Sequence, residues 1–200
     1  MTALVSVLVL AAAACSSPQA APVRPTEVAT SPPTNDPSTV GFTAYPADRA
    51  PALPVLSGAD LTGSTLTIPA AGAAVTVVNV WASWCQPCVA EMPKLRSVAA
   101  RFAADDVVVS GIATRDRTAA AVSFLSATGF DLPSLADPNG AKAARWGAIV
   151  PAAAVPSTLL VDSAGRVRAR WIGAVDGSRL GDEVCATLQE EKQTAASCPG

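Results

Sequence analysis

Past the N-terminal region, short apolar runs alternate with longer amphipathic stretches along the chain. The run Val75–Trp81 (V-T-V-V-N-V-W) is apolar and rich in β-branched residues, which predicts a buried strand. Residues 107–113 form a second run of this kind and predict another buried strand. The stretches 89–104 and 118–128 predict helices, and Gly129 marks the end of the second one.

The pattern changes toward the C-terminus. Leu135–Gly140 contains Asp, Pro, Asn and Gly and predicts a turn. Residues 158–161 and 166–172 predict two strands, which the sequence Asp162–Gly165 joins as a hairpin turn. A last helix is predicted over residues 178–192. Strands that alternate with helices, followed by a hairpin and a helix, predict an α/β domain with a central sheet covered on both faces.

The N-terminus begins with an apolar run, Ala3–Ala14, that is too short to span a bilayer as a helix. It fits the apolar segment of a signal peptide, which we predict over residues 1–14. Small residues before Cys15 look like a bacterial lipobox, which predicts cleavage before Cys15 and attachment of lipid to it. Ala12 stands where leucine is usual, and no Lys or Arg precedes the run. An uncleaved anchor, or simple cleavage that leaves Cys15 free, therefore remains an alternative.

The segment between Ser16 and Pro51 is rich in Pro, Ser, Thr and Ala. Such a composition buries too little apolar surface to offset its ordering entropy, so it predicts a disordered tether. We accordingly divide the chain after the signal peptide into a lipid-anchor site and linker over residues 15–50 and a folded domain over residues 51–200. The linker is either a flexible tether that holds the domain away from a membrane or a dispensable export segment.

Composition bounds the possible functions. The chain has 200 residues, half of them apolar, and a net charge of −2. This length and apolar content suit one domain with appendages. The sequence contains no basic block of the kind that binds nucleic acid or an anionic membrane surface, so we expect no nucleic-acid partner.

The candidate reactive residues lie in the segment Trp84-Cys85-Gln86-Pro87-Cys88, between the predicted strand at 75–81 and the predicted helix. Two thiols at this spacing can close a small disulfide ring or open to a dithiol. Cys85 would lie at the helix N-terminus, where the helix dipole favours the thiolate that attacks disulfides. Cys88 would lie one turn inside the helix, more enclosed, as a resolving thiol.

A C-x-x-C pair can also be half of a zinc site or a purely structural disulfide. Zinc needs four ligands, and this chain has no histidine and no second C-x-x-C. We therefore expect no metal and no cofactor. Once Cys15 is assigned to lipid and Cys85 and Cys88 to the redox pair, Cys185 and Cys198 remain, and in an exported chain two such cysteines usually pair.

Several segments between about Pro51 and Gln189 resemble the thioredoxin-like domain of the TlpA/ResA/CcmG group. These proteins are membrane-anchored, extracytoplasmic thiol-disulfide oxidoreductases, many of which serve cytochrome c maturation. The resemblance implies a thioredoxin-like fold with a central mixed sheet flanked by helices. The segments that carry it are Val78–Cys88, Glu91-Met92-Pro93, Leu135–Pro138 and Val155–Asp162.

The resemblance also implies roles for matching residues. Pro156 stands where the family has a cis-proline packed against the active disulfide, which exposes the backbone of Val155 to a substrate strand; the alternative is a trans proline that starts a strand. Trp84 would shape the substrate surface beside Cys85. Glu91 matches an acid that influences the cysteines and handles protons, the alternative being a solvated surface glutamate. Asn79 stands where cytoplasmic thioredoxins carry a buried aspartate.

The leading functional hypothesis is a disulfide reductase in which Cys85 attacks and Cys88 resolves. Its partners would be protein disulfide substrates, such as apocytochrome c, and a membrane dithiol carrier of electrons, with the lipid anchor holding it on the outer face of the bacterial cell membrane; a secreted form is the alternative. An oxidase of exported proteins uses the same residues in reverse. A peroxiredoxin would want threonine at Ala82, and a copper chaperone of similar fold would want a histidine, which the chain lacks. A pure binding module would not need both cysteines.

Overall fold

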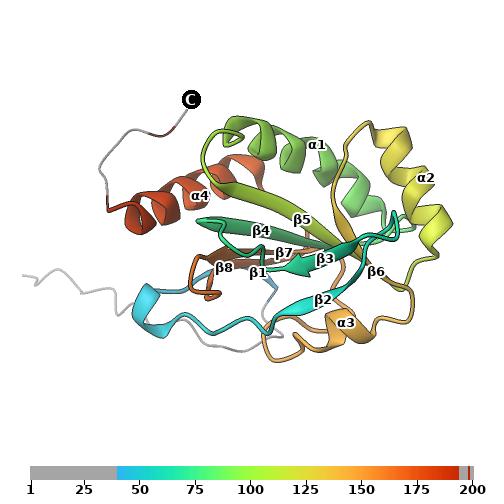
Figure 1. Ribbon diagram of the computed structural model, residues 1–200, viewed down its shortest axis with the longest axis horizontal. Helices are drawn as coiled ribbons and strands as arrows, with labels where there is room; N and C mark the ends of the chain where they lie inside the picture. Colours follow the sequence, from blue (N-terminus) through green and yellow to red (C-terminus); the bar gives the residue numbers. More distant parts are fainter. Residues whose placement is uncertain (1–39, 194–197, 199–200) are drawn as a thin grey trace, which may run out of the picture. The chain divides into compact units, whose positions relative to one another are not determined.

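A six-stranded sheet forms the centre of the domain in a computed structural model that describes residues 40–193 and Cys198 (Figure 1). The strand order is β1-β8-β7-β4-β5-β6, and a separate two-stranded hairpin is formed by β2 and β3. The strands are β1 (Gly41–Ala44), β2 (Leu56–Ala59), β3 (Thr65–Ile68), β4 (Val75–Trp81), β5 (Val107–Thr114), β6 (Ser134–Asp137), β7 (Ser157–Asp162) and β8 (Val167–Ile172). Because β4, β5 and β6 are parallel whereas β7, β8 and β1 pair antiparallel, the sheet is mixed, as the resemblance implies.

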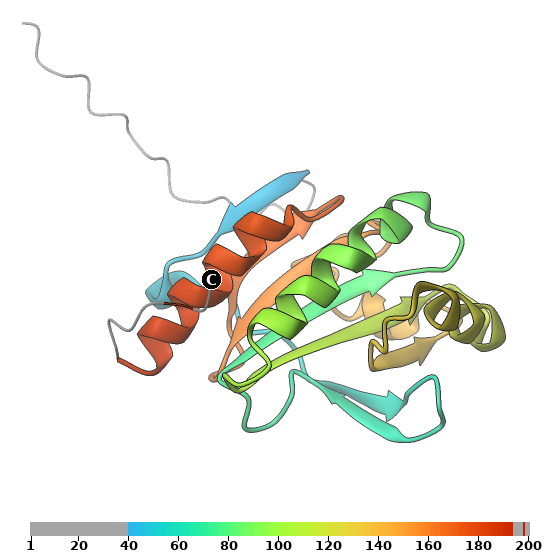
Figure 2. The same ribbon diagram turned by 90° about the horizontal axis from the view of Figure 1, so that it is seen from above.

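Helices cover both faces of this sheet. They are η1 (Ala47–Arg49, a 3-10 turn), α1 (Gln86–Arg101), α2 (Thr118–Thr128), α3 (Ala141–Ala144) and α4 (Gly177–Glu191). Helices α1 and α4 lie side by side on one face, whereas α3 and the β2–β3 hairpin lie on the other (Figures 1 and 2). Every helix in the described part of the chain is too short or too polar to cross a membrane.

Strand β4 shows why the core has two layers. All of its residues are buried, and alternate side chains point to opposite faces of the sheet. Val75, Val77 and Trp81 pack into the cluster beneath α1 and α4. Val78 and Val80 pack into the cluster on the opposite face, with Trp146. A strand buried on both sides is mainly apolar, which is the pattern that identified it in the sequence, and Thr76 and Asn79 are its two buried polar residues.

The predicted start of the domain at residue 51 is wrong. Strand β1 pairs with β8, so the described fold begins by Gly41. Phe42 packs its ring 4.9 Å from that of Trp171, and Tyr45 is buried. The prolines around Tyr45 give this segment a linker-like composition, although its two aromatic residues bury enough surface to hold it on the sheet. The predicted signal peptide and the rest of the predicted linker lie outside the described residues.

Other element boundaries differ from the predictions for local reasons. Helix α1 begins at Gln86 rather than at 89, because the Cys85 side chain caps it and Pro87 suits a first helical turn. The predicted turn at Leu135–Gly140 is a strand, β6, as far as Asp137 before it turns. The β2–β3 hairpin and α3 were not predicted, since short elements carry little periodicity. Helix α2 ends as predicted, with Gly129 at φ 63°.

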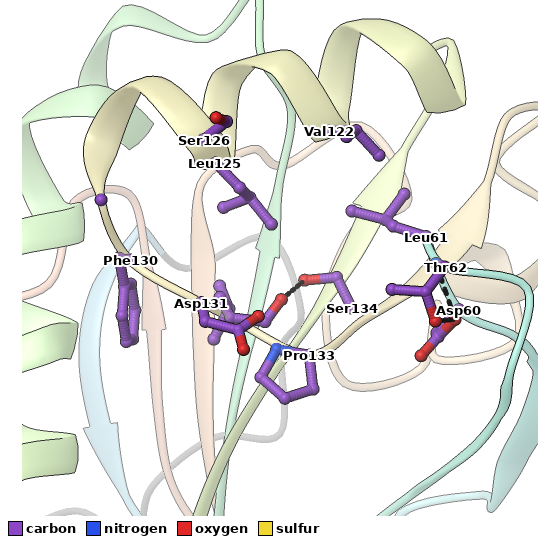
Figure 3. A pocket seen from close by; sticks show the side chains of 12 residues that line it. Asp60, Leu61, Thr62, Val122, Leu125, Ser126, Phe130, Asp131, Pro133 and Ser134 are labelled. Carbon is purple, nitrogen blue, oxygen red and sulfur yellow. Dashed lines mark hydrogen bonds between the residues drawn. The ribbon is translucent and has the colours of Figure 1, made fainter.

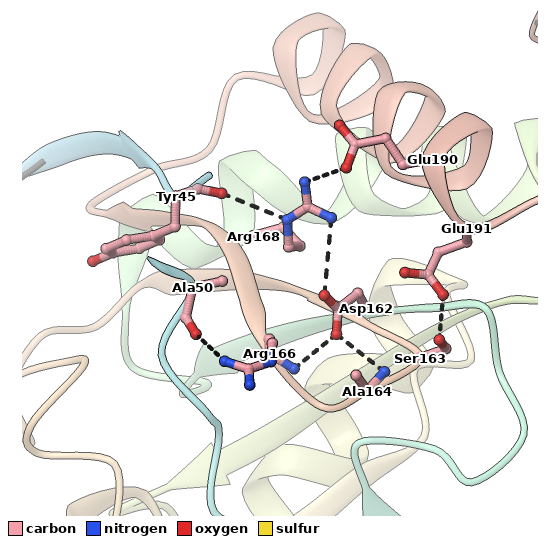
Figure 4. A network of polar contacts seen from close by, with 9 residues as sticks. All are labelled: Tyr45, Ala50, Asp162, Ser163, Ala164, Arg166, Arg168, Glu190 and Glu191. Carbon is pink, nitrogen blue, oxygen red and sulfur yellow. Dashed lines mark hydrogen bonds and ion pairs between the residues drawn. The ribbon is translucent and has the colours of Figure 1, made fainter. Parts of the chain in front are cut away.

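A polar network ties α4 and β1 to the β7–β8 hairpin (Figure 4). Arg168, which is 9% exposed, pairs with buried Asp162 across 3.8 Å and with Glu190 across 2.5 Å. Its Nε donates to the backbone oxygen of Tyr45 at 3.5 Å. The other Asp162 oxygen accepts from the backbone N–H groups of the turn, at Ala164 and Arg166. Arg168 thus neutralises a buried carboxylate and secures three elements.

Replacing Arg168 with methionine should lower the free energy of unfolding by roughly 3 kcal/mol, because it leaves the Asp162 charge buried without its cation. Denaturant unfolding measures this change. The control is Glu190→Gln, since that carboxylate is 56% exposed and its loss should cost less than about 1 kcal/mol. Equal losses in the two variants would contradict this account of the network.

The structure joins Cys185 of α4 to Cys198 in a disulfide, with 5.8 Å between the Cα atoms. Replacing both residues with serine should lower the free energy of unfolding by up to about 3 kcal/mol, since the closed loop is short. In the intact protein we predict that this bond resists a mild reductant that opens Cys85–Cys88. Mass spectrometry after partial reduction and alkylation checks this, and two free thiols in the exported protein would contradict it.

Candidate redox site

The site is built where β4 ends and α1 begins. Cys85 is the N-cap of α1, with an extended backbone (φ −89°, ψ 103°), and its Sγ accepts the N–H of Cys88 at 3.2 Å. The two sulfur atoms form a disulfide, with 5.3 Å between the Cα atoms. A sulfur that accepts an N–H and faces the positive end of a helix dipole is stabilised as a thiolate once the disulfide opens.

The sequence predicts that Cys88 is the more enclosed of the two cysteines. In this disulfide form the attacking Cys85 is itself only 4% exposed. Cys88 is fully buried, so the predicted order of accessibility holds. The surface beside Cys85 is formed by Trp84, which is 56% exposed, together with the exposed Gln86 and Pro87. A partner that reaches Cys85 therefore meets an exposed aromatic ring first.

Glu91 lies completely buried on α1, one turn beyond Cys88, which excludes the solvated surface glutamate. Its carboxylate accepts the Asn79 amide at 2.8 Å and the backbone N–H of Val175 at 3.1 Å. Burial raises the pKa of this carboxyl above its usual value. The two hydrogen bonds and the positive charge of Lys94 oppose that rise without cancelling it. A carboxyl with a raised pKa keeps its proton to a higher pH than an exposed carboxyl does, which suits it to a role in proton exchange.

Asn79 connects Glu91 to the neighbouring strand. It lies fully buried in β4, and its amide N–H groups reach Glu91 and the Thr158 hydroxyl, the latter at 3.1 Å. Its Oδ1 atom has no hydrogen-bond partner among the described residues. Because an amide does not titrate, Asn79 orients the acid and leaves Glu91 as the ionisable group of this buried pair.

Val155 and Pro156 precede β7, and the peptide bond between them is cis. Val80 of β4 pairs with Ser157 of β7, so this register puts Pro156 beside the end of β4, where the turn toward Cys85 starts. Pro156 is buried and Val155 is partly exposed. The structure thus places the predicted substrate-binding pair at the same edge of the sheet as the cysteines.

Sequence reasoning missed the loop after β5. The Asp116 carboxylate accepts the backbone N–H of Ser83 at 2.5 Å and the Ser83 hydroxyl at 3.0 Å. The Trp84 indole donates to the backbone oxygen of Arg115 at 3.1 Å. A signal was present, because polar residues that directly follow a strand parallel to β4 must lie at the edge where β4 itself ends.

The described part of the chain contains a cavity that is lined partly by residues of α2 (Figure 3). It measures about 540 Å³ and lies between α2, the turn before β3 and the segment before β6. Its walls are mostly apolar, with carboxylates from Asp60 and Asp131 at the rim, and neither cysteine of the pair lines it. This cavity is therefore not part of the redox site.

Comparison with known families identifies the fold. The family model described as Redoxin matches residues 44–183, which is well over half of the chain. The chain belongs to the Redoxin family. This redoxin has the thioredoxin-like fold that the sequence motifs implied, and the matched region starts within β1, in agreement with the corrected domain boundary.

The relatives to which the chain is similar are named as thiol:disulfide interchange proteins. The redoxin is 41% identical over 100 residues to the thiol:disulfide interchange protein DsbE homolog of Paracoccus denitrificans, a match that covers 50% of this chain and 51% of that protein. The chain thus spans about half the length of the curated relatives it matches. Among solved structures, a DsbF homologue from Corynebacterium diphtheriae and a secreted thiol-disulfide isomerase from Corynebacterium glutamicum each match with a TM-score of 0.69 and 28% identity. These matches cover 75% and 76% of this chain and 95% of each of those chains.

Proposed function

We propose that this redoxin is an extracytoplasmic thiol-disulfide oxidoreductase and that it works as a disulfide reductase. The observation that carries the proposal is the Cys85–Cys88 disulfide at the N-terminus of α1 with the buried Glu91 one turn beyond it. A structural disulfide needs neither a helix N-terminus at one sulfur nor a buried acid one helical turn beyond the other cysteine. The names of the relatives and of the similar structures support the same chemistry.

The reaction we propose has two exchange steps. In the reduced protein the Cys85 thiolate attacks one sulfur of a substrate disulfide, and the other substrate sulfur leaves as a thiolate and takes up a proton. The Cys88 thiol then loses its proton and attacks the Cys85 sulfur, which releases the second substrate sulfur as a thiolate that takes up the second proton. The substrate gains two electrons and two protons, and the Cys85–Cys88 disulfide forms. Glu91 accepts the Cys88 proton, for which its burial and raised pKa suit it.

For substrates we propose polypeptides, with the cysteine pair of apocytochrome c as the leading candidate. Trp84, Val155 and Pro156 would contact the substrate chain, since Trp84 precedes Cys85 and the register brings Pro156 beside the end of β4 at the same edge of the sheet. A membrane dithiol carrier would return the electrons. Export fits the Cys185–Cys198 disulfide, because structural disulfides persist in oxidising compartments. The predicted signal peptide and the lipid on Cys15, which would hold the domain at the outer face of the membrane, lie outside the described residues.

The direction of electron flow can be tested with a peptide that carries Cys-x-x-Cys-His, the sequence to which c-type haem attaches. The reduced redoxin should reduce the disulfide form of this peptide, and the oxidised redoxin should leave the dithiol form largely unchanged. We expect a reduction potential near about −270 mV, the thioredoxin end of the scale. Rapid oxidation of the dithiol peptide and a potential near about −120 mV would instead identify an oxidase.

A further inference from the structure

Arg115 has an unusual backbone for its residue type. It directly follows β5 and adopts φ 49°, in the left-handed region that non-glycine residues rarely occupy. Its N–H donates to the backbone oxygen of Asp137 at 2.8 Å, which fixes it to the end of β6. This conformation leaves the Arg115 carbonyl facing the Trp84 indole, which donates to it at 3.1 Å. Backbone strain of this kind persists only where surrounding contacts hold it.

The Arg115 side chain runs in a different direction from its carbonyl. Its stem passes over Gly140, where an added Cβ would lie only 3.0 Å from the Arg115 Cγ. The guanidinium then donates to the backbone oxygen of Ala152 at 2.6 Å. Ala152 belongs to the loop that leads into Val155 and Pro156. One residue thus reaches both the turn that carries Cys85 and the loop that carries the proposed substrate-binding backbone.

Asp116 reinforces the first of these links. It is 7% exposed, and both of its carboxylate oxygens bind Ser83, two residues before Cys85. A buried carboxylate with two charge-assisted hydrogen bonds holds its partner more firmly than a neutral acceptor does. The turn between β4 and Cys85 is therefore fastened to the β5–α2 loop at two successive residues, Ser83 and Trp84.

We propose that Arg115 and Asp116 are positioning residues that hold the Cys85 turn and the Ala152–Pro156 loop in one register, so that a polypeptide disulfide is aligned for attack. This role rests on the proposed function and deepens it. A polypeptide substrate touches both segments, so its reaction depends on their relative position. A small disulfide reagent needs only the Cys85 sulfur, and its reaction does not depend on that position.

The test compares two oxidised substrates for the reduced full-length protein: the disulfide form of the Cys-x-x-Cys-His peptide and a small uncharged aromatic disulfide. The main variant is Arg115→Gly, which removes the guanidinium and still accepts the left-handed backbone. We expect kcat/KM for the peptide to fall roughly tenfold while the rate with the small disulfide stays within about twofold. Asp116→Ala should show the same selectivity, and Asp116→Asn, which keeps one acceptor oxygen for Ser83, should recover part of the loss.

The control is Arg117→Ala, which removes the neighbouring exposed positive charge and should leave both rates unchanged. An Arg115→Gly protein with an unchanged peptide rate would overturn the positioning role. So would equal losses with both substrates, because that pattern indicates general damage to Cys85. If Asp116→Ala fails to fold, Arg115→Gly and Asp116→Asn decide the question. A parent protein that reacts with neither disulfide would overturn the proposed function, and the positioning role with it.

Discussion

Replacing Cys88 with serine should trap the protein in mixed disulfides with its substrates, whereas replacing Cys85 should abolish exchange. Cys85 caps α1 and is the more accessible of the two sulfurs, so it is the atom that attacks. Without the Cys88 thiol nothing displaces the substrate from Cys85, and the intermediate accumulates. Non-reducing electrophoresis and mass spectrometry of adducts from cells that export each variant measure this effect.

The matched control is the Cys185→Ser/Cys198→Ser double variant, whose redox pair is intact. It should form no more adducts than the parent protein and should exchange disulfides at the parent's rate. Adducts that accumulate on Cys88 in the Cys85→Ser variant, in the amounts seen for Cys88→Ser, would show that the roles of the two cysteines are reversed.

Glu91→Gln should slow exchange by roughly a hundredfold near neutral pH, within the range expected when a general acid or base is lost. Glutamine keeps the shape and can still accept the hydrogen bond from Val175, but it cannot take a proton from Cys88. The rate of the parent protein should rise with pH as Glu91 ionises, and this rise should be absent from the variant. Stopped-flow measurement of peptide disulfide reduction at a series of pH values compares the parent protein with the variant. Identical pH profiles for the two proteins would contradict the role of Glu91.

The same substitution makes an independent prediction about stability. The folded pKa of Glu91 is raised above its ordinary value of 4.5, so the folded state binds the proton more tightly than the unfolded state does. The free energy of unfolding should therefore fall as pH rises from about the ordinary value through the raised one, because the folded protein must then bury a charge. Glu91→Gln should remove this fall, and the exposed Glu190→Gln should not. Denaturant unfolding at a series of pH values checks both.

Strong local signals in the sequence predicted much of this fold. The mainly apolar, β-branched run Val75–Trp81 is the strand β4 at its predicted bounds, because a strand buried on both faces is built mostly from apolar residues. Helix α2 ends at Gly129, where the left-handed backbone favours glycine. The cysteine pair at the start of α1 was evident because its spacing, the preceding strand and the following helix point to the same chemistry.

Features that depend on contacts distant in sequence were beyond prediction. Phe42 holds β1 to the sheet through Trp171, a partner that no local pattern could identify. The buried Glu91 carboxylate accepts the N–H of Val175, which lies in the loop before α4 and is distant in sequence. The role proposed for Arg115 depends on its hydrogen bond to the backbone oxygen of Ala152, a residue distant in sequence. Its left-handed backbone conformation is also one that arginine rarely adopts. The redox chemistry of the cysteine pair could therefore be predicted from the sequence motif. The residues that surround the pair could be identified only from the folded structure.

A redox titration of the full-length protein, with the thiols located by alkylation and mass spectrometry, shows which cysteine pair is redox-active. We predict a single reversible two-electron couple confined to Cys85 and Cys88, with the Cys185–Cys198 disulfide closed throughout. The central claim would be contradicted if Cys85 and Cys88 stayed oxidised across the range of potentials while the Cys185–Cys198 bond opened and closed.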